Sequence, residues 1–322
     1  MKKVVILTPF YIPSVGGAET FAYELYKESC KCAITCVITL PEKMQLEFKK
    51  NPFSGTGIKQ LLQIFPKLLS VAVKANNKIN FDTIHALGLN AAAVGLILKW
   101  LYRKKLIVTV LALYDFDGRS LISRMTRFIL NRADMIFSEG ETGKKDLINA
   151  GVKPAKIKTF NHWVDQDIFR PCYNHDKYLK VIFIGRAIPI KGISIIHKLR
   201  EKLMSTDVVF SIVENIGYEY LPAFYKWADV LIVPSMYSEG FVRVVAEGAS
   251  AGLAVLTSNC GALPEMVKDF GVTCNPCVKE FEDFLTDWHK NRRALYSLQK
   301  KSARYAKKHF NASNARSMID EY

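Results

Sequence analysis

The feature that most constrains the fold is an alternation of short β-branched runs with helical stretches. Helices separate the strands, the first from about Ala18 to Ser29. Such alternation predicts a parallel sheet covered by helices on both faces. Five strands are expected before residue 140: Val4–Thr8, Ile34–Leu40, Thr83–Ala86, Leu106–Leu111 and Met135–Ser138.

The same pattern starts again after Arg170-Pro171. Further strands are expected at Val181–Ile184, Val208–Val213, Val230–Val233 and Ala254–Thr257, and helices at Ile193–Met204, Leu221–Ala228 and Val242–Ala251. The sequence therefore predicts an α/β protein of two Rossmann-like domains, with residues 1–170 in the first. Ligands of open α/β sheets bind beyond the carboxyl ends of the strands, so we expect a binding cleft between the two domains.

Composition excludes several classes of protein. Hydrophobic residues make up 49% of the 322 residues and charged residues 23%, as in globular rather than disordered chains. The longest apolar run, Ala91–Leu98, is far shorter than the roughly 20 residues that span a bilayer. The run Val4–Leu7 is too short for a signal peptide, so we expect a cytoplasmic protein.

The chain is strongly basic, with 45 Lys and Arg against 30 acidic residues and a net charge of +15. Residues 1–170 contain 25 of the basic and 14 of the acidic residues. This excess favours an anionic partner, such as a phosphate, a membrane surface or nucleic acid. A lysine-rich solubilising surface is the alternative.

The stretch Ile58–Lys78 has apolar residues at helical spacing and lysines on the opposite face, with Pro66 expected to kink or restart the helix. Two interpretations are open. The helix packs its apolar face into the domain core, or it lies on an anionic membrane at the inner face.

Metal-binding patterns are weak. The pair Cys274 and Cys277 has ligand spacing but no second such pair, and the seven cysteines do not suggest a disulfide framework. The Asp-x-Asp strings at Asp115–Asp117 and Asp165–Asp167 are of a kind common by chance, so we expect no bound metal.

Glycine-rich loops follow the first strand of each half. Gly16 and Gly17 lie between a strand and a helix and allow close approach of a ligand to the main chain. In the second half, Arg186 and Lys191 frame a loop that could hold a diphosphate, the arginine as a fork and the lysine as a point charge.

The most informative segment begins at Glu239 and ends at Glu247, with Gly240, Phe241, Val242 and Arg243 between them. Glu239 precedes a helix and can accept hydrogen bonds from sugar hydroxyls. The amides of residues 241–243 would face a phosphate at the helix N-terminus. Glu247 lies two turns further and could chelate a ribose diol.

Together, the Gly16–Glu19 loop, the Gly185–Gly192 loop and the Glu239–Glu247 element resemble those of the retaining GT4 glycosyltransferases, which have the GT-B fold. The resemblance covers about residues 3–270. It implies a 171–303 donor domain and a 1–170 acceptor domain that the last helix, about 304–322, rejoins. It also implies transfer of a hexose from a UDP- or GDP-linked sugar without a metal or other cofactor.

The resemblance also implies roles for single residues. Arg186 and Lys191 would stabilise the leaving diphosphate, and Glu239 would position the donor sugar as the third catalytic residue. Gly16, Gly17, Gly240, Phe241, Val242, Arg243 and Glu247 would contact the donor. The basic first domain suggests a glycan, lipid-linked or other anionic acceptor, with nucleic acid as a less favoured one.

Some positions differ from the family pattern. Val242 replaces a glycine, Leu111 replaces a histidine, His162-Trp163 replaces Asn-Gly, and the segment between Val213 and Ala228 is short. These features favour an alternative, a non-catalytic homologue that acts as a binding or scaffolding subunit. A third interpretation is a nucleotide-sugar epimerase or a phosphorylase of the same architecture.

Overall fold

The computed structural model describes residues 1–45, 57–111, 120–173, 177–237 and 241–322. The chain divides into two compact units, residues 1–161 with 313–322, and residues 162–312. The boundary expected from the sequence, at residue 170, lies nine residues further along. Of residues 304–322, expected as the returning helix, residues 313–322 belong to the first unit.

The first unit is built on a six-stranded parallel sheet in the order β2-β1-β3-β4-β5-β6. Its core strands are continuous apolar runs because helices cover both faces. β6 was not expected from the sequence. The strands are β1 (Lys3–Leu7), β2 (Ile34–Ile38), β3 (Thr83–Leu87), β4 (Lys105–Val110), β5 (Met135–Glu139) and β6 (Ile157–Phe160).

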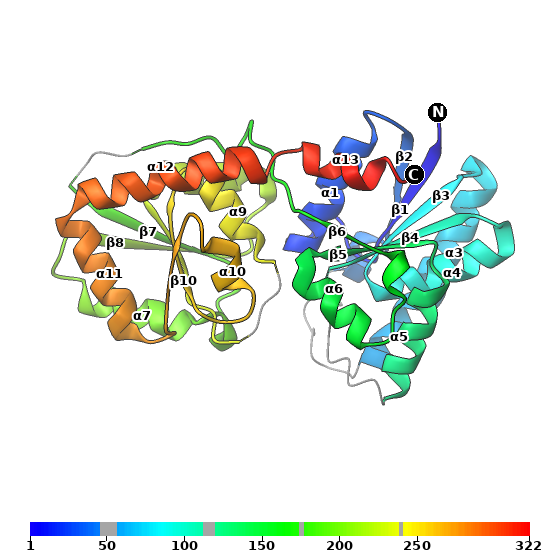
Figure 1. The fold of residues 1–322 in the computed structure, drawn as a ribbon, viewed down its shortest axis with the longest axis horizontal. Coiled ribbons are helices and arrows are strands. Elements are labelled where there is room, and N and C mark those ends of the chain that lie inside the picture. The colour runs from blue at the N-terminus through cyan, green and yellow to red at the C-terminus, as the bar shows by residue number, and fades with distance from the viewer. Residues whose placement is uncertain (46–56, 112–119, 174–176, 238–240) are drawn as a thin grey trace. The chain divides into compact units, whose positions relative to one another are not determined.

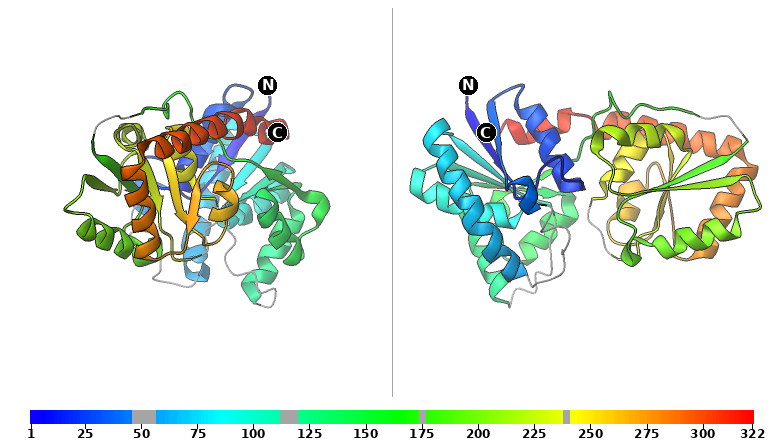
Figure 2. Two further views of the ribbon diagram at one scale, coloured as in Figure 1. Left: turned by 60° about the vertical axis from the view of Figure 1, so that its left-hand side comes forward. Right: turned by 180° about the vertical axis from the view of Figure 1, so that it is seen from behind.

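Right-handed crossovers distribute the helices of this unit between the two faces. One face carries α1 (Gly17–Ser29) packed against α13 (Ser313–Ile319) (Figure 1). On the other face α3 (Gly57–Ile79) packs against α4 (Leu89–Tyr102), and α4 packs against α5 (Leu121–Arg132). Figure 2 shows the same two layers from behind. The remaining helices are α6 (Gly140–Asn149) and the 3-10 turn η1 (Pro154–Lys156).

The burial of the α3 side chains that the structure describes, residues 63–79, decides between the two interpretations of the Ile58–Lys78 stretch. Ile64, Leu68 and Ala72 are fully buried in the core, so the apolar face is not available to a membrane. The expected restart of the helix at Pro66 is wrong, because a single helix runs through it. Pro66 lies on the exposed side, where the hydrogen bond lost to the ring faces water.

The second unit is built on a five-stranded parallel sheet in the order β11-β10-β9-β7-β8. Helices α7 and α11 pack together, and so do α9 and α12. The strands are β7 (Leu179–Ile184), β8 (Val208–Val213), β9 (Val230–Val233), β10 (Ala254–Ser258) and β11 (Val272–Cys274). The helices are α7 (Ile193–Lys202), α8 (Leu221–Trp227), α9 (Arg243–Ser250), α10 (Leu263–Val267), α11 (Val278–Lys290) and α12 (Arg292–His309), with 3-10 turns η2 (Pro189–Lys191) and η3 (Tyr218–Tyr220).

The predicted fold class of two parallel α/β sheets is confirmed. Among the described residues, each helix is too short or too polar to cross a membrane.

Candidate functional site

The carboxyl edge of the second sheet brings together the loops that follow β7 and β9. These strands are neighbours, yet their crossovers leave in opposite directions, toward β8 and toward β10. Such a switch point separates the loops and makes room for a ligand. The loop after β7 carries Arg186, which is exposed, and Lys191, which is half-buried at the end of η2.

Gly192 fixes this loop against the loop after β9. Its φ of +75° is left-handed, and a Cβ there would lie 2.0 Å from the carbonyl oxygen of Pro234. The amide of Met236 also donates to the carbonyl of Ile190, at 2.8 Å. Only glycine fits this position, so the sequence Lys191-Gly192 holds the lysine beside the loop that leads to α9.

Helix α9 begins at Arg243, one residue after the Val242 that was expected to start it. Glu239 and Gly240 lie outside the described residues. The side chain of Val242 is 7% exposed and packs in the apolar cluster with Val245 and Val213. Its branched side chain therefore points into the core of the unit.

Phe241 stacks on His162. Their ring centroids are 3.7 Å apart with an angle of 12° between the planes, and His162 is 6% exposed. Phe310 meets the same phenylalanine edge to face, at 6.1 Å. The aromatic contacts hold the chain on the approach to α9 in one conformation.

Arg243 and Glu247 form a buried ion pair within α9. Arg243 Nε donates to Glu247 Oε1 at 2.8 Å, and the two side chains are 8% and 3% exposed. The hydroxyl of Tyr225 in α8 donates to the other carboxylate oxygen, also at 2.8 Å. Burial, and next the charge of Glu247, raise the pKa of Tyr225 well above its ordinary value, so it stays a donor. Glu247 thus has a protein partner on each oxygen.

In the first unit, Gly16 and Gly17 lie where β1 leads into α1. The Glu19 carboxylate is buried and folds back over this turn, since a Cβ on Gly16 would lie 2.2 Å from Glu19 Oε2. The hydroxyl of Thr20 donates to the carbonyl of Gly16 at 3.0 Å. A side chain at position 16 would displace the Glu19 carboxylate, an acid that is favoured at this helix N-terminus.

The weak metal patterns gain no support. Asp115–Asp117 lie outside the described residues, and Asp165 accepts a hydrogen bond from the amide of Asp167, as in a local turn. The seven cysteine thiols are free, with Cys274 buried and Cys277 exposed. No cluster of three potential metal ligands occurs among the described residues. Binding without a metal stays a prediction.

Three contributors to this site were not identified from the sequence. His162 was noted only as a departure, and neither Tyr225 nor Glu214 was noted. Glu214, at the end of β8, accepts a hydrogen bond from the amide of Ala187 and so positions the loop of Arg186. No local motif marks these residues, because each acts across strands or helices distant in sequence.

Two family profiles match successive parts of the chain. The family "Glycosyltransferase Family 4" matches residues 15–168, and "Glycosyl transferases group 1" matches residues 196–309. The chain is 27% identical over 203 residues to the D-inositol 3-phosphate glycosyltransferase of Mycobacterium tuberculosis and Mycobacterium bovis. That match covers 50% of this chain and 42% of the mycobacterial protein, less than half its length.

Solved structures share the fold. Sucrose-phosphate synthase from Thermosynechococcus elongatus superimposes with a TM-score of 0.79 at 16% identity, over 100% of this chain and 98% of that one. Anabaena HepE in complex with UDP-glucose gives a TM-score of 0.74 at 16% identity, over 100% and 99%.

Proposed function

Because this chain belongs to the GT4 family of group 1 glycosyltransferases, we propose that it transfers a hexose from a UDP- or GDP-linked sugar with retention of configuration. The observation that carries the proposal is the fixed contact of the Gly192 loop with Pro234. It holds Lys191 against the loop after β9, and we expect a diphosphate there to meet this cation and the N-terminus of α9. HepE, which shares the fold, binds UDP-glucose.

In the proposed reaction, Arg186 and Lys191 bind the diphosphate and stabilise the charge that develops as the sugar leaves. The amides at 241–243 add the partial positive charge of a helix N-terminus. Glu239 holds hydroxyls of the donor sugar, and Gly16 and Gly17 let a main-chain turn approach the donor. We propose that Arg186 and Lys191 bind the diphosphate without a metal ion.

The acceptor proposed here is an anionic glycan or a lipid-linked glycan. Most of the excess positive charge lies in residues 1–170, which favours an anionic acceptor. The mycobacterial relative is named for an acceptor that carries a phosphate, D-inositol 3-phosphate.

A second candidate, a non-catalytic binding subunit, is favoured by one observation. Glu247, the expected ribose ligand, is 2% exposed and engaged by Arg243 and Tyr225. A donor whose ribose needs this carboxylate would have to compete with both partners. This candidate predicts binding of a nucleotide sugar or an acceptor without turnover.

The first experiment is a thermal-shift panel of UDP, GDP, ADP, TDP and their sugars. A one-site ligand at 100 times its Kd stabilises the folded state by about 2.7 kcal/mol. We expect one nucleotide series to stand out, the shift to be lost in Lys191→Ala, and the shift to persist in Lys198→Ala, an exposed lysine of α7. A shift that survives Lys191→Ala contradicts the diphosphate role. Release of the nucleotide only with an acceptor then separates transferase from binding subunit.

A further inference from the structure

Helix α5 exposes several large apolar side chains, although it also buries Leu130 in the core. It buries two small polar residues, Ser123 and Thr126, which are 5% and 6% exposed. It exposes large apolar ones, Leu121 at 66%, Met125 at 48% and Phe128 at 44%. An ordinary surface helix keeps its large apolar side chains toward the core. Water is therefore an unfavourable neighbour for these three side chains.

The neighbouring helix extends this face. At the end of α4, Trp100 is 55% exposed and Leu101 is 63% exposed. Trp100 meets Phe128 of α5 edge to face, with ring centroids 6.3 Å apart. Because α4 packs against α5, this contact brings exposed apolar side chains of the two helices together. We call Trp100, Leu101, Leu121, Met125 and Phe128 the α4–α5 patch.

Arginines accompany the patch. Arg124 and Arg132 are exposed on α5, and Arg132 lies over the Phe128 ring at 3.7 Å. Arg103 is exposed at the end of α4. The sequences of α4 and α5 contain no acidic residue, and residues 48–133 contain fourteen Lys and Arg against three acids. Much of the excess positive charge of the sequence thus falls within residues 48–133.

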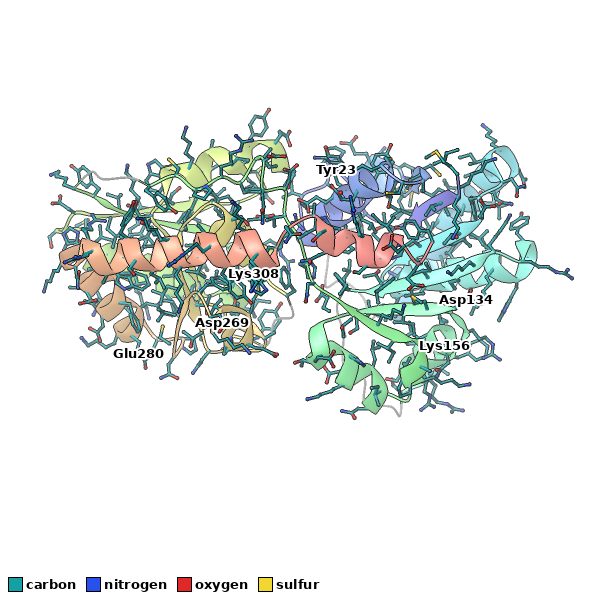
Figure 3. All side chains as sticks on the ribbon, turned by 45° about the horizontal axis from the view of Figure 1, so that its top comes forward. Tyr23, Asp134, Lys156, Asp269, Glu280 and Lys308 are labelled. Carbon is teal, nitrogen blue, oxygen red and sulfur yellow. The ribbon has the colours of Figure 1, made fainter. Side chains whose placement is uncertain are left out.

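The acid that follows α5 is already engaged. The Asp134 carboxylate forms an ion pair with Lys99 at 2.5 Å. Its second oxygen accepts a hydrogen bond from the amide of Leu106 at 2.8 Å. Figure 3 shows Asp134 near Lys156, whose side chain donates to the carbonyls of Asn131 and Ala133. Asp134 is therefore paired with Lys99 and not with the arginines of α5.

We propose that the α4–α5 patch docks this protein on an anionic lipid bilayer. Such a surface offers an apolar boundary for Met125, Phe128 and Trp100, and tryptophan is favoured at the depth of the head groups. Anionic head groups attract the flanking arginines. Contact with a second copy would bring arginines against arginines, with no acid on either helix to pair with them.

The test is co-sedimentation of the full chain with vesicles of phosphatidylcholine, with and without one third phosphatidylglycerol. We expect binding only to the anionic vesicles, falling as salt is raised. The double variant Arg124→Gln/Arg132→Gln should bind about 20-fold more weakly. The control Arg293→Gln/Arg304→Gln, which removes the same charge from exposed positions of α12, should bind like the parent.

Apolar variants test the other half of the proposal. Met125→Ser/Phe128→Ser should lose about tenfold in affinity, whereas Met204→Ser, at a methionine 83% exposed in the second unit, should not. Trp100 is more exposed than Trp163 and Trp288, so its emission should shift to the blue on vesicles, and Trp100→Phe should remove the shift. Binding that is absent, or unchanged in the patch variants, overturns the proposal. The proposal is also overturned if the protein forms a dimer without lipid and Phe128→Ser dissociates that dimer.

Discussion

The hydroxyl of Tyr322 lies 2.9 Å from Nδ1 of His85, although 237 residues separate the two in the chain. The other ring nitrogen of His85 lies 2.7 Å from the hydroxyl of Thr109 in β4. Ser29, at the end of α1, lies 3.1 Å from the same tyrosine hydroxyl. These buried hydrogen bonds join the C-terminal Tyr322 to α1, β3 and β4 within the first unit.

Tyr322→Phe should destabilise the first unit by about 1–3 kcal/mol, because His85 and Ser29 would each lose a buried hydrogen-bond partner. Hydrogen exchange of the amides in β3 and α13 measures the free energy of opening there. Tyr220→Phe is the matched control, since that residue is 64% exposed. Equal exchange in the two variants would show that the hydroxyl contributes no stability.

The first unit should lose stability in acid. Burial lowers the pKa of His85 from 6.5 to about 3. Between these values the unfolded chain binds a proton that the folded chain does not. The contribution of neutral His85 to the free energy of unfolding is therefore complete above pH 6.5. It falls by about 1.4 kcal/mol per pH unit as the pH drops toward 3. Urea unfolding at several pH values measures the slope. The slope should shrink in His85→Gln and persist in His197→Gln, an exposed histidine.

Arg243→Leu should destabilise the second unit by about 3–5 kcal/mol, because it leaves the Glu247 carboxylate buried without its cation. The double variant Arg243→Leu/Glu247→Leu should recover much of that loss. The matched pair is Lys279 and Asp283 of α11, also four residues apart but 75% and 57% exposed. Its coupling energy should be below about 1 kcal/mol. Double-mutant cycles from urea unfolding measure both, and equal coupling energies would contradict this account.

Gly192→Ala should disrupt the loop of Lys191, since the new methyl would meet the Pro234 carbonyl in a strained backbone. We expect reduced stability and loss of the thermal shift with nucleotide. Gly140→Ala is the control, with a φ of +61° but open space around the added carbon. It should cost only the backbone strain, about 1 kcal/mol. Nucleotide binding that persists in Gly192→Ala would exclude the loop contact as a requirement.

Lys191→Ala and Glu239→Ala should each lower turnover at least about 100-fold while the fold is retained, because each removes a group that acts on the departing donor. Initial rates of nucleotide release, with circular dichroism as the check on folding, measure this. Near-parent turnover in either variant removes that residue from the catalytic set. Arg200→Ala, an exposed cation on α7, is the control and should be fully active.

Local patterns in the sequence predicted much of what the structure contains. Runs such as Val230–Val233 are apolar at every position and mostly β-branched, which is typical of buried strands in a covered sheet. The positions of Gly16 and Gly192 followed from the turns between strand and helix. β6 was missed because its four residues include the exposed Lys158, which breaks the apolar run.

Pro66 shows the limit of local rules, because core burial of Ile64 and Leu68 outweighs the hydrogen bond that the proline removes. Packing likewise decided which helix exposes apolar side chains that could contact a membrane. The amphipathic helix at Ile58–Lys78 buries its apolar face, while α5 exposes large apolar side chains.

The sequence by itself determined the two α/β units, the glycine turns and the order of the loops at the sheet edges, because strand propensity, helical spacing and backbone conformation are local properties. Only the tertiary structure decided which charged side chains already have partners within the protein. Arg243 and Glu247 satisfy each other, with Tyr225 from another helix, and Tyr322 reaches His85 across most of the chain. A side chain's partners depend on distances between elements, which no short stretch of sequence specifies.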